Sequence, residues 1–378
     1  MPEFQLMAGL FRDPVSRLSN TDEYTYIVPT GYGYGFNPVW DNVWNNTIVS
    51  LYNNGNGVIT QSQETTLTTL NSLNALSNLL NPFTPITLGG DVNNANRDAG
   101  IAIWGNVADT MLKYYLFAAN GAYDYQASNQ LGLNQVPNNY NYSFGLNSKG
   151  NLKYGIRVEF TPTMLGYKNS SGFVDQDTFL GALNNLTIGL GYEQQKFDCT
   201  TGDVLCGALG GASNTVSSLT PKYYDIDANW QQKFGDFVPE VQLGWAEKKD
   251  IAKIGSQKVK SDGYYVQLAA MYDQVVGLGK PEIAFRWEQS TIKNAIYTSG
   301  FNPSANGTLT GEEDGKINRY GIFVNYYIAG EAAKLSFGAD VVNPNSNLKN
   351  VCFNYNGSTC TNNLKSFTDW TLALQTEF

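Results

Sequence analysis

From residue 97 to the C-terminus the chain repeatedly alternates between apolar and polar side chains. In the stretch 152–161 one set of alternate positions, which we call a parity, contains Leu152, Tyr154, Ile156, Val158 and Phe160. The other parity contains Lys153, Gly155, Arg157 and Glu159. A repeat of two residues is the period of a β-strand with two unlike faces. No run of about 18 apolar residues occurs, so helical membrane spans are excluded. The pattern predicts an all-β chain.

Twelve segments fit this alternation, and we expect a strand in each. They lie near residues 3–10, 97–106, 110–120, 150–162, 186–197, 221–233, 237–248, 261–275, 280–294, 315–328, 331–344 and 366–378.

The connections between these segments distinguish a soluble β-sandwich, which alternates too, from a membrane protein. Counted back from the C-terminus, they are short at 329–330, 277–279 and 234–236, long at 345–365 and 295–315, and intermediate at 249–260. Tight turns at one end and long loops at the other are typical of outer-membrane barrels. The sequence therefore predicts a single transmembrane antiparallel up-and-down β-barrel over 1–378. Segment 162–185 is the one connection too long for the short-turn end.

Residues 11–96 form a connection far longer than ordinary loops, ahead of the barrel strands at 97–378. Thr60 and Gln63 fit a capping box at the start of a helix, and leucines then recur at near-helical spacing up to Leu80. Asn81-Pro82 would end this helix, so we expect one amphipathic helix in the segment. The segment leaves the long-loop end of the barrel. It either folds inward as a constriction or lies outside as a surface flap, and periodicity alone favours neither.

Composition restricts the function classes. The 378 residues contain no histidine, only 15% are charged, 13% are aromatic, and the net charge is −9. An acidic chain is unsuited to nucleic acid, and the absence of histidine removes the commonest general base and metal ligand. We therefore expect no enzyme activity, no cofactor, no metal site and no nucleic-acid partner. A residual carboxylate mechanism would use Asp225, Asp227 and Glu240.

Four cysteines occur as two close pairs, Cys199 with Cys206 and Cys352 with Cys360, each around a polar stretch. Local pairing costs the least loop-closure entropy, so we expect two disulfides within loops and an oxidising compartment. Four free thiols are the alternative.

Several segments resemble the phosphate-selective porin O and P family. They are "FQLMAGLFRDPVSR" at 4–17, "NRDAGIAIWGNVADTMLKYYLFAANGA" at 96–122, "YGIRVEF" at 154–160, "GYYVQLAAMY" at 263–272, "RYGIFVNYYIAGEAAKLSFGADVV" at 319–342 and the terminal "TLALQTEF". The resemblance implies a trimeric 16-stranded porin of the Gram-negative outer membrane, with an inward-folded loop and a terminal Phe. Because twelve strands are visible and no leader precedes Phe4, we expect about four strands and a signal peptide to be missing from the sequence.

The polar parity would line a water-filled lumen if the apolar parity faces lipid. The predicted pore-lining residues are Lys113, Lys153, Arg157, Glu159, Asp225, Asp227, Glu240, Glu282, Arg286, Glu288, Arg319, Lys334 and Asp340. The same parity also carries Lys233, Asp98, Glu193, Asp273, Asp369 and Glu377, so that anions outnumber cations.

This excess predicts a weakly selective diffusion channel for small hydrophilic solutes or ions, although the resemblance implies phosphate or other anions. Arg12, Arg17 and Arg97, at the roots of the long loop, are candidates for anion contacts at a constriction. Salt bridges from the loop to the wall are the alternative role for these arginines.

The apolar parity also carries aromatic residues suited to the membrane interface: Tyr192, Trp230, Trp245, Tyr264, Tyr272, Tyr320, Tyr326, Trp370 and Phe378. The lipid bilayer is therefore the expected partner. A surface-exposed adhesin or structural outer-membrane barrel is the competing interpretation, because long polar loops suit partner contact.

Overall fold

A computed structural model describes residues 2–21, 25–30, 81–86, 97–120, 146–147, 151–199, 217–254, 257–293, 314–345 and 366–376. Two sheets account for the strands of these residues. The larger contains twelve strands, and the smaller contains three short ones in the order β4-β7-β8. Among the described residues, no helix has the length and hydropathy of a membrane span.

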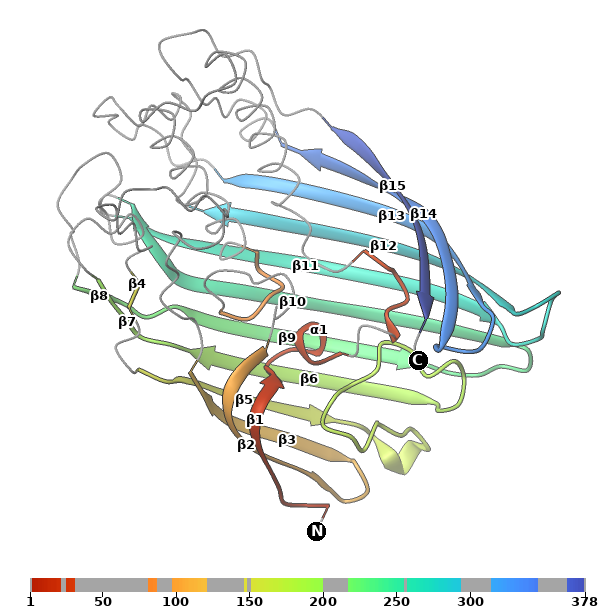
Figure 1. The fold of residues 1–378 in the computed structure, drawn as a ribbon, viewed down its shortest axis with the longest axis horizontal. Helices are drawn as coiled ribbons and strands as arrows, with labels where there is room; N and C mark the ends of the chain where they lie inside the picture. Colours follow the sequence, from red (N-terminus) through yellow and green to blue (C-terminus); the bar gives the residue numbers. More distant parts are fainter. Residues whose placement is uncertain are drawn as a thin grey trace, which may run out of the picture.

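In the large sheet each strand is hydrogen-bonded to its neighbours along the chain (Figure 1). In order, the strands are β1 (Gln5–Arg12), β2 (Arg97–Val107), β3 (Leu112–Ala119), β5 (Lys153–Phe160), β6 (Asn185–Gln194), β9 (Lys222–Gln231), β10 (Phe237–Ile254), β11 (Gln257–Tyr272), β12 (Lys280–Lys293), β13 (Gly315–Tyr327), β14 (Ala333–Pro344) and β15 (Phe367–Thr376). The small sheet consists of β4 (Leu146–Asn147), β7 (Phe197–Cys199) and β8 (Ser218–Leu219).

Every pairing in the large sheet is antiparallel. All twelve predicted strands are present, with ends that differ by a few residues. The predicted fold class, an all-β antiparallel up-and-down sheet of the transmembrane-barrel type, is confirmed. The edges are β1 and β15, which are not paired with each other.

The intermediate loop expected at 249–260 is wrong. Strand β10 continues to Ile254, β11 begins at Gln257, and the pair Ala252 and Val259 lies in register between them. A register shift separates Lys248 from Ala252, and Asp250 has φ 56° within it. Lys248 pairs with Ser261 and Ala252 pairs with Val259, so three residues of β10 lie between these pairs against one residue of β11, and the bulge holds two extra residues. This irregularity interrupts the alternation, so the strand is not recognised from a period of two residues.

The two faces of the sheet are chemically inverted relative to a soluble protein. The convex outer face exposes apolar side chains, for example Leu243 (47%), Ile283 (58%) and Ile322 (59%). The inner face buries charged ones: Arg286 and Lys153 are both fully covered. An apolar outward parity with a polar inward parity is the arrangement of membrane-spanning antiparallel barrels.

Two segments cover the inner face. The N-terminal insertion, residues 13–96, is described at 13–21, 25–30 and 81–86, and contains the short helix α1 (Arg17–Asn20) with a Ser16–Ser19 capping box. Figure 1 shows α1 lying over the middle of the sheet. Ile27 and Val28 pack with Ala269, Ala284 and Phe323 of the wall. The described parts of the insertion thus lie inside, whereas the predicted helix at 60–80 is outside the described residues.

The second covering segment, which we call the strap, is residues 169–179 between β5 and β6. It follows a 3-10 helix at Thr163–Leu165. Phe173 of the strap packs edge-on against Trp104 (ring centroids 5.5 Å apart) and Tyr115 (5.4 Å) of the wall. The connection at 162–185 is therefore too long for a periplasmic turn because it folds back over the inner face.

Close approach of the insertion to the wall requires a glycine at position 191. A Cβ atom there would overlap the backbone oxygen of Val15. We expect Gly191→Ala to destabilise the folded protein by about 1–3 kcal/mol through overpacking, as measured by urea unfolding from detergent micelles. Gly172→Ala is the matched control, because a Cβ at Gly172 meets nothing closer than 3.6 Å. Equal stability of the two variants would contradict the close approach.

Candidate functional site: the covered inner face

Lys153, at the start of β5, joins four elements near the long-loop end of the sheet. Its Nζ forms ion pairs with Asp13 of the insertion and Asp98 of β2, and lies 3.8 Å from Oε2 of Glu193 on β6. Glu193 also accepts a hydrogen bond from the backbone N–H of Ile86, at the far end of the insertion. The lysine therefore fixes both described ends of the insertion to the wall.

Arg157 is the centre of a second cluster, at mid-height of the sheet. Its guanidinium lies 2.8 Å from Glu159, 2.6 Å from Asp227 and 3.4 Å from Asp225. Asp227 also accepts a hydrogen bond of 3.2 Å from the backbone N–H of Arg17, at the start of α1. The short helix is thus positioned over β9 by a wall carboxylate.

Arg17 and the strap hold the two covering segments together. The guanidinium of Arg17 donates to the backbone oxygen of Gln176, and Asn20 Nδ2 donates to that of Phe173 over 2.8 Å. Thr21 and Asp175 form a parallel bridge. Burial alone would lower the pKa of Arg17, but Asp175, Asp177, Asp227 and Glu240 raise it above its ordinary value.

Asp175 anchors the strap to the wall through Lys113 of β3, with 2.8 Å between the charged atoms. Both side chains are buried. Burial would raise the pKa of Asp175, but Lys113, Arg17 and Arg157 outweigh it and lower that pKa below its ordinary value. The carboxylate is therefore ionised at neutral pH and holds the strap electrostatically.

A third cluster lies on β12, β13 and β14. Arg286 Nε is 3.0 Å from Glu288, and Arg319 Nη2 is 2.5 Å from Asp340. Both arginines donate to Thr30 Oγ1 of the insertion over 2.8 Å. Both guanidinium groups thus donate to one hydroxyl of the insertion, which adds a hydrogen-bond acceptor to the carboxylates that the wall supplies.

Two acids of the inner face are satisfied mainly by neutral donors. Glu240 accepts from Gln231 (2.6 Å) and Gln242 (2.9 Å), and Glu282 accepts from Asn325 (2.7 Å) and the Tyr327 hydroxyl (3.0 Å). Lys334 donates to the backbone oxygen of Tyr26 in the insertion.

All thirteen residues that the sequence assigns to the pore wall lie on the inner face and are buried. They are Lys113, Lys153, Arg157, Glu159, Asp225, Asp227, Glu240, Glu282, Arg286, Glu288, Arg319, Lys334 and Asp340. The structure brings them together under the insertion and the strap. Their role in conduction stays a prediction.

The arginine candidates are divided. Arg17 bridges insertion and strap, and Arg12 donates to the backbone oxygen of Thr21 over 2.8 Å, so both hold covering segments in place. The backbone of Arg97 is paired with Arg12, but its side chain is outside the described residues. Lys233 and Asp273 form an ion pair just beyond β9 and β11, at the turn end, with Lys233 44% exposed, and their assignment to the lumen stays a prediction.

The strap residues Asp175 and Asp177 and the wall residue Lys248 were not predicted as site residues, although all three are buried. Phe173, Asp175, Asp177 and Phe179 share one parity and are all buried, so a short period-2 signal does exist in the strap. This alternation lies in the connection between two expected strands, and for that reason it did not predict site residues. The chain's disulfides stay a prediction, because Cys206, Cys352 and Cys360 are outside the described residues.

Carboxylates outnumber cations on the covered face. Among the described residues the buried cations are Arg17, Lys113, Lys153, Arg157, Lys248, Arg286, Arg319 and Lys334. The buried carboxylates are Asp13, Asp98, Glu159, Asp175, Asp177, Glu193, Asp225, Asp227, Glu240, Asp262, Glu282, Glu288 and Asp340, of which Asp262 lies on the outer parity. No group of three or more metal-ligating side chains is arranged for a metal ion in the part of the chain that the structure describes.

The outer face carries aromatic side chains at both ends of an apolar band. On β11, Tyr264 (46% exposed) and Tyr272 bracket Val266, Leu268 and Ala270. Their eight-residue separation is about 27 Å along the strand at ~3.4 Å per residue, or about 21 Å across the membrane at a tilt of ~40°. This is close to the apolar height of an outer-membrane barrel.

An antiparallel sheet with an aromatic-bordered apolar outside and an ionic inside defines a protein of the outer-membrane β-barrel class. The sequence matches no family model and no curated protein. Among solved structures, it is similar to a loop L8 deletion mutant of OmpT, an outer membrane protein of Vibrio cholerae. That structure has 10% identity and a TM-score of 0.32, with 67% of this chain and 60% of that chain covered.

In-vitro folded OmpT in its trimer form, also an outer membrane protein of Vibrio cholerae, has 13% identity and a TM-score of 0.29, with 71% of this chain and 60% of that chain covered. The chain thus spans about 60% of the length of both structures. At these scores the likeness carries no argument about the site, and the class rests on the sheet itself.

We expect Asp175→Asn to destabilise the protein by about 3 kcal/mol at neutral pH, because it removes the carboxylate that forms an ion pair with the buried Lys113. The folded-state pKa of Asp175 is lowered, so its stabilisation is present above the ordinary pKa of an aspartate, about 4, and is lost as the pH falls through the folded-state value. Unfolding free energies measured from neutral to acid pH should therefore converge for the variant and the wild type.

The control is Asp250→Asn, which removes a partly exposed pair with Lys258 (3.0 Å). Its effect should stay below about 1 kcal/mol. A pH-independent difference between Asp175→Asn and the wild type would contradict the electrostatic anchor.

Proposed function

We propose that this protein is a porin of the Gram-negative outer membrane, through which small hydrophilic solutes or ions diffuse passively past an inward-folded constriction. The observation that carries the proposal is the inverted sheet: apolar side chains face outward, and the charged parity faces a lumen that the insertion and the strap narrow. The resemblance to the phosphate-selective porin O and P family supports this function, and a homotrimer is part of the proposal.

The charges of the inner face argue for weak selectivity. Buried carboxylates exceed buried cations among the described residues, and most of the cations are engaged by acids. Selectivity depends on the charge at the narrowest point, and a strong anion filter requires cations there that are not neutralised by the wall. The channel of this proposal therefore admits phosphate and other anions without strongly preferring them.

The tight cover of the inner face favours a second candidate, a plugged structural or adhesive barrel. Lys113, Lys153 and Arg286 are fully buried rather than bathed in water. A barrel filled at every height conducts little current, so conductance separates the two functions.

We propose no catalytic role. The acids considered for one are committed to neighbours: Asp225 and Asp227 to Arg157, and Glu240 to Gln231 and Gln242.

Reversal potentials test the selectivity. In planar bilayers with a potassium chloride gradient, we expect a permeability ratio of anion to cation within about twofold of one, because the lumen charges largely neutralise each other. A strong anion preference would contradict the weak selectivity that the charges of the inner face predict.

Removal of the link between insertion and strap should widen the path. We expect Arg17→Ala to increase single-channel conductance and to shift the preference toward cations, because Asp175, Asp177 and Asp227 lose a shared cation. Lys249→Ala, on the outer face, is the control and should conduct as the wild type does. If neither the wild type nor Arg17→Ala conducts, the plugged structural barrel is the better account.

A further inference from the structure

Six successive strands carry lysines on the outer face near the long-loop end, and one lysine of each strand forms a row; Lys258 of β11 lies two residues beyond this row. The lysines of the row are Lys196 just beyond β6, Lys222 on β9, Lys249 on β10, Lys260 on β11, Lys293 on β12 and Lys316 on β13. We call this set the lysine belt. Each belongs to the outward parity, since a residue next to it is buried: Phe197, Tyr223, Lys248, Ser261, Ile292 and Ile317, in the order of the belt.

The strand register places several belt lysines side by side. Lys222 is directly opposite Lys249, and Lys260 is directly opposite Lys293. Between β10 and β11 the regular register stops at the pair Lys248 and Ser261, one residue before Lys249 and Lys260. Like charges directly opposite each other destabilise a sheet. The two pairs of facing lysines therefore carry a cost that an external anion would relieve.

Carboxylates on the same face relieve only part of this charge. Lys249 lies 2.8 Å from Glu247, Lys293 lies 2.6 Å from Asp262, and Lys196 lies 3.6 Å from Asp198. Within the described ranges, no carboxylate forms an ion pair with Lys222, Lys260 or Lys316. Asp250 is paired with Lys258, outside the belt. The belt is thus positive overall.

The height of the belt matches a lipid headgroup layer. Directly below it, toward the middle of the sheet, lie the outward aromatic residues Tyr224, Tyr264 and Tyr320, and the Lys249 amine sits 4.9 Å from the ring centre of Tyr224. Aromatic rings take the interfacial level of a membrane, and cations just beyond them lie among the phosphates. At the opposite end, the described lysines Lys233 and Lys280 both pair with Asp273.

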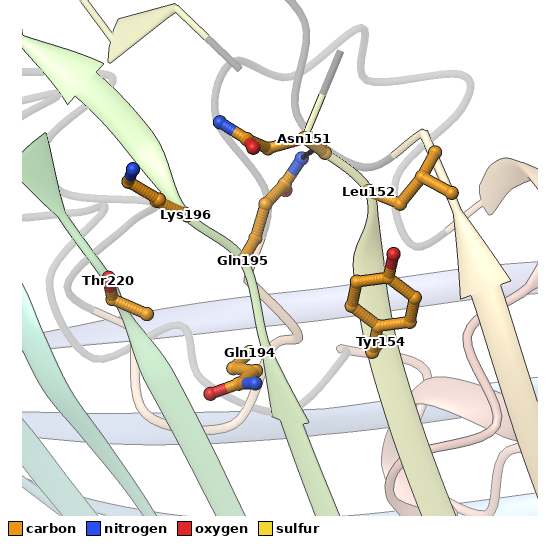
Figure 2. Close-up of a pocket in the computed structure, with 7 residues that line it drawn as sticks. All are labelled: Asn151, Leu152, Tyr154, Gln194, Gln195, Lys196 and Thr220. Carbon is orange, nitrogen blue, oxygen red and sulfur yellow. Dashed lines mark hydrogen bonds between the residues drawn. The ribbon is translucent and has the colours of Figure 1, made fainter. Parts of the chain in front are cut away.

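A cavity at one end of the belt could receive a headgroup. It has a volume of about 260 Å³ and lies between β5, the end of β6 and the start of β9. Figure 2 shows Lys196, Gln194, Tyr154 and Thr220 around it. An amine, an amide and hydroxyl groups on one outward-facing pocket suit phosphate and sugar oxygens.

We propose that the lysine belt binds the phosphate-bearing headgroups of lipids in the outer leaflet, with Lys222 and Lys260 as its principal cations. The inference rests on the membrane orientation of the proposed function and not on conduction. Bound headgroups neutralise the adjacent lysines and fix the height of the barrel in the membrane.

The test uses the full chain folded in detergent and titrated with lipid A that carries both phosphates. Native mass spectrometry measures the bound lipid. Lys222→Gln with Lys260→Gln should weaken binding about tenfold, because each cation near an anionic lipid surface contributes to attraction. Lys222→Arg with Lys260→Arg should restore it. The matched control, Lys233→Gln with Lys280→Gln, removes two cations at the turn end and should bind as the wild type does.

A second arm uses the wild type alone, so that it does not depend on how the variants fold. Lipid A from which both phosphates have been removed should bind at least about tenfold more weakly. Equal binding of the two lipids, or an equal loss in the control variant, would overturn the proposal. So would displacement of the lipid by millimolar inorganic phosphate, which would make the belt a site for free phosphate.

Single-channel conductance distinguishes a failure of the lipid-binding proposal from a failure of the proposed porin function. Lys222→Gln with Lys260→Gln should conduct as the wild type does, because both side chains lie outside the lumen. A wild type that binds lipid but does not conduct would contradict only the porin.

Discussion

The pairing of buried charges on the inner face is the constraint on which the rest of this structure depends. An isolated buried ion is strongly destabilising, whereas a paired and hydrogen-bonded one is tolerated. Lys153 and Arg157 each form ion pairs with several carboxylates of the wall. Lys153 also pairs with Asp13 of the insertion, and Asp227, a partner of Arg157, accepts a hydrogen bond from the insertion. The inner face can therefore be covered only by segments that bring matching charges. The insertion supplies Asp13 and Arg17, and the strap supplies Asp175.

This constraint makes the wall and its cover interdependent. The strap enters from the turn end and the insertion from the long-loop end, and they meet where Thr21 and Asp175 bridge. Each segment is held by the wall and by the other segment, so loosening one exposes charges that the other must then balance. The cover of the inner face is therefore held by a network of ion pairs rather than by one loop.

The sequence predicted the twelve strands because the alternation that defines them is local. The prediction was wrong or incomplete where the alternation is interrupted or where the structure depends on contacts between distant residues. At β10 two extra residues around Asp250 interrupt the alternation, so the strand beyond them reads as a loop. The direction of the insertion was left open because it depends on partners such as Asp13 and Lys153, which are 140 residues apart. The strap was missed because Phe173, Asp175, Asp177 and Phe179 alternate within a connection that was expected to be a turn.

The two kinds of lysine show how parity decides chemistry in this sheet. Lys113 and Lys153 point inward, and each is balanced by carboxylates of the covering segments. Lys222 and Lys260 point outward at the rim and lie opposite other lysines. A shift of one residue in any strand would exchange the two roles, exposing acids to lipid and placing uncompensated cations in the lumen. The register that turns apolar side chains outward therefore also sorts the cations between the lumen and the membrane surface.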